Sequence, residues 1–316
     1  MPVVNENQAG QIGSGDTDQC MPVTRKTDVF TVPKRVLAVA NAGIDQTELF
    51  AKLAALRARF GCEINLLAFR GARPGSSAPL GDARVIEDHL RLCAMSYFTE
   101  GDGLTIDVRN LIDKNHSLSE SVIRYVDENA IDLVVKTGHR SEDIFHCPED
   151  WYLNRHMNCN MMILPERQWR PKKHILLAVD IESDRPSQKA LNERLFAWAA
   201  RLKGDSHQLT VMTTIEIHDA LATLDMLAPS RRIRQQGQPL KDRMREALSK
   251  HGLDDADVVV SAGDPARKIL SNANRLQAET VLVGSAARNG IERIFNGNTA
   301  EQVMHHLRTA LFVIKR

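Results

Sequence analysis

The order of apolar runs and helical patterns occurs twice along the chain, and this repetition constrains the fold more than any other sequence feature. In the first half, the apolar runs VLAVA (36–40) and EINLLAF (63–69) enclose a segment with apolar residues at helical spacing (46–60). In the second half, HILLAVD (174–180) and QLTVMTTI (208–215) enclose another such segment. Short apolar runs that alternate with amphipathic helices predict βαβ units and a parallel sheet.

Residue matches between the halves indicate a duplication. Three pairs of segments align: 36–41 with 175–180, 132–136 with 279–283, and 153–164 with 303–314. A repeat of this length is too long for a solenoid. The sequence therefore predicts an α/β protein with two tandem domains, each an open, mostly parallel five-stranded sheet flanked by helices.

The predicted domains cover residues 32–165 and 174–316. Between them, PERQWRPKK (165–173) is bounded by Pro, charged and without apolar periodicity, which is typical of a linker. Residues 1–31 are rich in Gly, Asn, Gln, Asp and Thr, and can bury too little apolar surface to offset the entropy of ordering. We expect them to form a disordered tail.

Composition favours a cytoplasmic protein. The 41 Lys and Arg residues nearly balance the 40 Asp and Glu residues, so a net charge of +1 gives no electrostatic reason to expect direct nucleic-acid or membrane binding. No apolar run approaches the roughly 18–20 residues of a membrane span. The N-terminus lacks the order of a secretory signal, and the five cysteines are scattered without a C-x-x-C pair, which fits a reducing compartment.

The stretch VGSAARNGIERIFNGNTAEQV (283–303) is the strongest candidate for a ligand site. We expect a strand to end at Val283 and a helix to open at Asn298, with a Gly-containing loop between them. That arrangement directs free backbone N–H groups and the positive end of a helix dipole at one place, which suits an anion such as phosphate. Gly284 and Gly297 would let the backbone approach a ligand closely.

Two further candidates end strands of the same half. Asp180 ends its first strand and Gly263 another, and ligands of open α/β sheets bind beyond the carboxyl ends of the strands. Turn and cap architecture explains part of the pattern without a ligand: residues 298–301 form a capping-box pattern, and Asp264-Pro265 is typical of a helix N-cap followed by Pro. Both interpretations stay open.

Other motifs carry weaker signals. His139, His146 and Cys147, and the pair at 305–306, match no standard zinc spacing, so no metal site is expected, and Cys147 lacks a partner constellation for nucleophilic catalysis. The basic run 231–234 follows a predicted loop (216–232) and reads as a solvated loop or as a phosphate-contacting patch.

From residue 33 to 316 the chain resembles the universal stress protein family, in particular its tandem type. The most specific match is GxxxxxGIxxxFxGNTAEQVxxHLRxxLxVIK at the C-terminus. In nucleotide-binding members the loop is G-x-x-G, nine residues, then G-S or G-T. Gly284 and Gly297 match its first and last glycines, whereas Ala287 replaces the second glycine and Asn298 the hydroxyl residue, with Thr299 following one position late.

The resemblance also assigns the two halves different roles. Asp180 matches the carboxylate that holds the base or sugar end of a nucleotide, but Asn41 stands at this position in the first half. Thr137 replaces Gly284, and Cys147-Pro148 replaces Gly297-Asn298, where Pro removes an N–H donor. The resemblance therefore implies a degenerate first half and a candidate ligand site in the second.

Three functional hypotheses follow. The first is a non-catalytic stress-response protein that binds and signals during oxidative stress or DNA damage, with its halves paired through their last strands as an intramolecular pseudo-dimer; a homodimer of the whole chain stays open. The second is an ATP-binding protein with slow hydrolysis in the second half, since no residue is an evident general base. The third is a different small ligand in the same crevice, lined by Leu224, Met226 and Leu227, which otherwise pack in the core.

Overall fold

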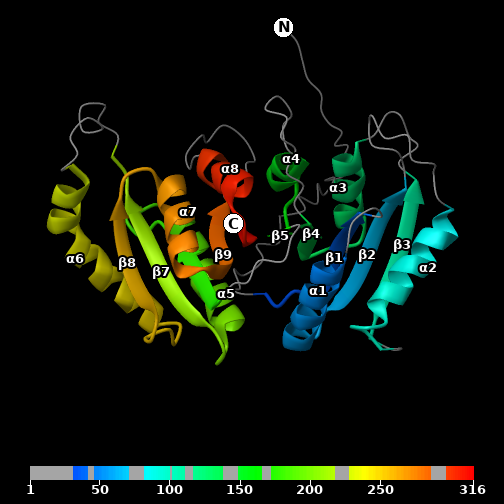
Figure 1. The fold of residues 1–316 in the computed structure, drawn as a ribbon. Coiled ribbons are helices and arrows are strands. Elements are labelled where there is room, and N and C mark those ends of the chain that lie inside the picture. Colours follow the sequence, from blue (N-terminus) through cyan, green and yellow to red (C-terminus); the bar gives the residue numbers. More distant parts are fainter. Residues whose placement is uncertain are drawn as a thin grey trace, which may run out of the picture.

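The structure is a computed structural model in which the two halves of the chain lie side by side (Figure 1). It describes residues 31–41, 46–70, 82–99, 102–110, 117–137, 149–165, 172–217, 228–285 and 297–316. The predicted tail before residue 31 and most of the linker, 166–171, lie outside the described residues.

The strands form one ten-stranded sheet in the order β3-β2-β1-β4-β5-β10-β9-β6-β7-β8. The first five are β1 (Arg35–Asn41), β2 (Glu63–Arg70), β3 (Leu104–Asn110), β4 (Leu133–Thr137) and β5 (Asn160–Leu164). The second five are β6 (Lys172–Ala178), β7 (Gln208–Ile215), β8 (Asp257–Ala262), β9 (Ala278–Ser285) and β10 (Ala310–Lys315). All neighbours are parallel except β5 and β10, so the predicted fold class, an α/β fold built on parallel sheets, is confirmed.

Helices cover both faces of the sheet. One face carries α1 (Thr47–Phe60), α2 (Ala83–Ala94), α5 (Pro186–Lys203) and α6 (Ala228–Ser249). The other carries α3 (Leu118–Glu128), α4 (Glu149–His156), α7 (Pro265–Leu276) and α8 (Gly297–His306). Because the central strands are covered on both sides, they are continuous apolar runs.

Local sequence signals fix several helix ends. Ser117 and Glu120 form a reciprocal capping box at the start of α3, and Asp264 caps α7 by accepting the Arg267 N–H at 2.8 Å, with Pro265 in the first turn. The predicted cap at Asp264 is therefore confirmed. Gly61 ends α1 with a left-handed φ of 64°.

Strand register reproduces the internal sequence repeat. In the first half Val36 pairs with Leu133, and in the second half Ile175 pairs with Thr280. These two pairs are the positions that the sequence alignment matches. The next strand pairs agree as well. Leu133 pairs with Asn160 of β5 and Thr280 pairs with Ala310 of β10, and the sequence alignment matches residue 160 with residue 310.

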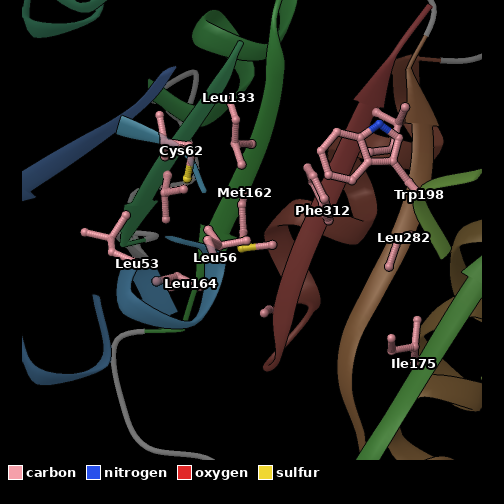
Figure 2. Close-up of a cluster of buried hydrophobic side chains, with 14 of the residues drawn as sticks. Leu53, Leu56, Cys62, Leu133, Met162, Leu164, Ile175, Trp198, Leu282 and Phe312 are labelled. Carbon is pink, nitrogen blue, oxygen red and sulfur yellow. The ribbon is translucent and has the colours of Figure 1, made fainter. Parts of the chain in front are cut away.

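The seam between the halves is the antiparallel ladder of β5 and β10, centred on the pair Met162 and Phe312 (Figure 2). Beyond the ladder, the Lys315 N–H donates to Asn160 Oδ1 at 2.9 Å and the Lys315 ammonium donates to the Asn154 carbonyl. That carbonyl lies in the last turn of α4, where a cation is electrostatically favourable. Lys315 thus caps a helix of the other half.

Side chains on both sides of the seam extend the contact. Trp198 of α5 makes edge-on contacts with Phe60 of α1 and with Phe312, at centroid distances of 5.6 and 4.8 Å. Glu279 of β9 accepts from Lys52 of α1 at 2.9 Å and contacts His207 Nε2 at 3.1 Å. Each of the two large core clusters contains buried residues from both halves.

Several element boundaries differ from expectation. α6 begins at Ala228, so Arg231, Arg232 and Arg234 lie on a helix, and the end of the predicted loop 216–232 is wrong. Pro239 lies inside the helix, where it cannot donate a backbone hydrogen bond. β9 continues to Ser285 because β10 pairs with it as far as Lys315. None of the helices that the structure describes is both long and apolar enough to span a bilayer.

The buried ammonium at the seam makes stability depend on pH. Burial lowers the pKa of Lys315 from 10.5 to about 8. Between these values the unfolded chain binds more protons than the folded chain, so the free energy of unfolding should rise with pH across this window by about 3 kcal/mol. Lys315→Met should lack this rise in urea titrations from pH 7 to 10.5.

Lys250→Met is the matched control, because the Lys250 side chain is exposed and pairs only with Glu246 among the described residues. It should keep the wild-type pH profile. Parallel profiles for wild type and Lys315→Met would contradict the prediction.

Candidate functional site

The order of strands in the second half reverses between β6 and β9. The chain runs from β6 outward to β7 and β8 and then returns to place β9 on the other side of β6. Ligands of open α/β sheets bind beyond the carboxyl ends of the strands at such a point. Leu177 of β6 pairs with Leu282 of β9. Asp180 comes three residues after Leu177 and Gly284 two residues after Leu282, so both lie toward the same end of the sheet. We call this region the β6–β9 end.

Asp180 is partly buried at the β6–β9 end. Burial raises the pKa of its carboxyl group; the backbone N–H groups of Ser183 and Glu182 oppose the rise, and the Glu182 and Glu216 carboxylates add to it. The Ser183 N–H donates to Asp180 Oδ1 at 3.2 Å. The Asp180 carboxylate is therefore a partly desolvated acceptor, and a hydrogen bond from a ligand would stabilise its charged form.

Two buried amides on α5 hold the main chain at this point. Asn192 Nδ2 donates to the Asp180 carbonyl at 2.7 Å, and Gln188 Nε2 donates to Asn192 Oδ1 at 2.9 Å. Sequence reasoning missed both residues. The signal that could have found them is a pair of amides four residues apart on the apolar face of a helix.

Gly284 lies inside β9, not in a loop, and its φ is not positive. A Cβ added there would lie 2.7 Å from Leu191 Cδ2, 3.0 Å from Leu191 Cγ and 3.3 Å from Leu195 Cδ1. The absent side chain lets α5 pack closely on β9. Gly284 therefore has a packing role whether or not a ligand approaches it.

The remaining predicted residues lie in three settings. Gly263 follows β8, with a φ of 128°, and its N–H donates to the Ile215 carbonyl at 3.0 Å. Because β8 is two strands from β6, Gly263 lies about 10 Å from Asp180 across the sheet. Gly297 and Asn298 open α8, one residue earlier than expected, and Thr299 is half-buried in its first turn. Ala287 lies outside the described residues, as do Leu224, Met226 and Leu227.

In the first half, the position corresponding to Val283 is Lys136, whose ammonium is buried. It lies 2.6 Å from Asp150 Oδ1 and 3.7 Å from Glu149 Oε2, in the first turn of α4. Burial lowers the pKa of Lys136, but the two carboxylates outweigh it and the net shift is upward. The half thus places its own carboxylates where a helix N-terminus would attract an anion.

The second half has no such charges at the corresponding positions. Alignment of α4 with α8 matches Glu149 with Thr299 and Asp150 with Ala300. Of these, Ala300 is buried and contributes to the core. The two halves therefore share a backbone plan but differ in charge at this end.

A metal centre finds no support in the described part of the chain, which contains no group of three or more His, Cys, Asp or Glu side chains that could hold a metal ion. His139, His146 and Cys147 lie outside that part. The thiol of Cys159 is buried, and burial raises its pKa to about 12.

The fold is that of an α/β protein with two repeated units, which differ in charge at the positions matched with Lys136, Glu149 and Asp150. Residues 172–315 match the Universal stress protein family. The fold is similar to that of a functionally unknown protein from Pseudomonas aeruginosa PAO1 (TM-score 0.66, 19% identity, 90% of this chain and 92% of that chain). It is also similar to a universal stress protein from Archaeoglobus fulgidus (TM-score 0.53, 15% identity, 89% and 96%).

The second half of the chain, residues 172–315, belongs to the universal stress protein family. The chain is similar to universal stress protein E of Escherichia coli K12, with 34% identity over 206 residues. That match covers 62% of this chain and 64% of the relative, so it spans less than two thirds of the relative's length.

Gly284→Ala tests the packing role. The added methyl group must displace Leu191, which should lower the free energy of unfolding by about 1–3 kcal/mol in urea titrations. Gly237→Ala is the control, because its Cβ would lie at an ordinary 3.4 Å from Ile233 Cγ2 in α6 and should stabilise the helix by up to about 1 kcal/mol. Unchanged stability of Gly284→Ala would contradict the packing role, because it would mean that Leu191 moves away from the methyl group without a cost in free energy.

The matched residues of the second half suggest a control for the Lys136–Asp150 ion pair of the first half. Asp150→Ala should destabilise the chain by about 3–5 kcal/mol, because it leaves Lys136 buried without its nearest carboxylate. Lys136→Val with Asp150→Ala copies Val283 and Ala300 and should recover most of that loss. Equal destabilisation in the single and double variants, measured by urea unfolding, would contradict the pairing.

Proposed function

We propose that this chain is a cytoplasmic stress-response protein that binds a nucleotide in its second half and signals through that binding rather than through catalysis. The family supports the stress-response role, including survival under oxidative or DNA-damaging conditions. The difference in charge between the two halves carries the proposal that binding is confined to one of them.

The first half opposes binding of an anion. Glu149 and Asp150 lie in the first turn of α4, within 3.7 and 2.6 Å of the Lys136 ammonium. A phosphate group arriving there would meet two carboxylates, and like charges at this separation repel strongly when partly buried. We infer that this half is a scaffold.

The second half favours an anion with a donor-bearing group attached. The first turn of α8 carries no acidic residue, so no carboxylate there opposes a phosphate group at the positive end of the helix dipole. Asp180 would accept hydrogen bonds from the base or sugar end. ATP with Mg²⁺ combines both features, and Gly284, Gly297, Asn298 and Thr299 would lie toward the phosphates.

The seam supports a self-contained pseudo-dimer. The β5–β10 ladder, the Lys315 cap and the Trp198 contacts join the halves within one chain. We infer that each half would pair or aggregate if it were separated, because its last strand would then be exposed. No described feature assigns a nucleic-acid partner.

Calorimetry of the full chain with ATP–Mg²⁺ tests the proposal. One site per chain is expected, because the first half is filled by its own charges. Asp180→Asn should weaken binding by about tenfold, the size of one charged hydrogen bond. Asp255→Asn is the control, because its side chain is exposed and pairs with Lys203.

No heat at millimolar ATP would remove the nucleotide and leave a different small ligand as the alternative. Two sites per chain would contradict the inactive first half. Release of phosphate in the same samples would favour slow hydrolysis over binding alone.

A further inference from the structure

Gln188 and Asn192 are polar residues on a buried face of α5. Their exposed fractions are 9% and 3%, and they lie one turn apart among Leu191, Leu195 and Phe196. Burying an amide costs free energy unless hydrogen bonds replace those it makes to water. Their presence among leucines therefore needs an explanation in the contacts that they make.

Those contacts lead out of the helix to Asp180. Gln188 Nε2 donates to Asn192 Oδ1, which turns the Asn192 amino group toward the Asp180 carbonyl, 2.7 Å away. Asp180 follows the β6 strand: the Val179 N–H donates to the Met212 carbonyl at 3.0 Å as the last described bond to β7. Asn192 thus holds the first residue beyond the ladder.

A second buried asparagine in the same half provides the comparison. Asn272 of α7 is 9% exposed and donates to Lys268 O of its own helix at 2.9 Å, while its Oδ1 accepts from Arg275. These bonds stay within one helix and concern only its stability. The Asn192 bond instead joins a helix to the residue that carries the carboxylate of the β6–β9 end.

We propose that Asn192 is a positioning residue, which fixes the Asp180 main chain so that the carboxylate meets the donor-bearing end of the nucleotide, and that Gln188 orients Asn192. This rests on the proposed function. As a consequence, α5 sets recognition of the base or sugar end of the nucleotide, whereas α8 sets recognition of phosphate.

Asn192→Ala separates these two ends. In the full chain it should weaken ATP–Mg²⁺ binding by about tenfold, the loss expected for one misplaced hydrogen bond. Binding of tripolyphosphate, which has no base or sugar, should change by less than about twofold. Asn272→Ala is the matched control and should leave both affinities near wild type.

A second readout needs no ligand. Carboxyl ¹³C NMR should show the pKa of Asp180 falling toward its ordinary value in Asn192→Ala, because a loosened main chain admits water to the carboxylate. Asn272→Ala should leave it unchanged. Gln188→Met, which removes only the amide that orients Asn192, should give the same shifts to a smaller extent and serves if Asn192→Ala does not fold.

The outcomes are separable. If wild type binds neither ATP nor tripolyphosphate, the proposed function fails, and the NMR titration still decides whether Asn192 positions Asp180. If Asn192→Ala weakens both probes equally, or leaves the Asp180 titration unchanged, the positioning role is overturned.

Discussion

The antiparallel ladder between β5 and β10 is the contact on which the rest of the structure depends. It is the one antiparallel step in the described sheet, and it turns two five-stranded units into one layer with helices on both faces. Because the sheet is continuous, the core clusters on each face draw residues from both halves. The ladder also brings Lys315 of β10 to the last turn of α4, so a helix of the first half is capped by the second.

The two halves show how one backbone plan can carry different chemistry. Both place a helix after their fourth strand, and both bury a matched residue near the end of that strand. In the first half that residue is Lys136, which requires the carboxylates of α4. In the second half it is Val283, which requires no charged partner, and the first turn of α8 carries no acidic residue. Burial of a single lysine thereby accounts for the carboxylates that the first half has and the matched positions of the second half lack.

Much of the fold could be predicted from periodicity, because fully buried parallel strands are continuous apolar runs with helical segments between them. The internal repeat also matches the observed register, because Val36 with Leu133 and Ile175 with Thr280 occupy aligned positions. Periodicity could not place the start of α6, whose first turns are polar and exposed on nearly all sides. Such turns lack the stripe of apolar residues from which a helix is predicted in a sequence.

The candidate site was less predictable. Glycine at 284 suggested a loop for a ligand, but the packing of Leu191 against it is a contact between distant segments that local sequence does not contain. The same holds for Asn192 and for Lys136, whose partners are 12 and 14 residues away. Ala287 and its neighbours lie outside the described residues, and the division of the chain at 165–174 stays a prediction.

The joined sheet has a further consequence for solubility. Two separate five-stranded sheets present four outer strands with unpaired backbone groups, each a template for intermolecular pairing, whereas the joined sheet presents β3 and β8 alone. β3 carries the ion pair Asp107–Arg109, with the guanidinium over Tyr125, and charges on an outer strand oppose the docking of another. The described sheet therefore has half as many outer strands open to intermolecular pairing as two separate sheets would have.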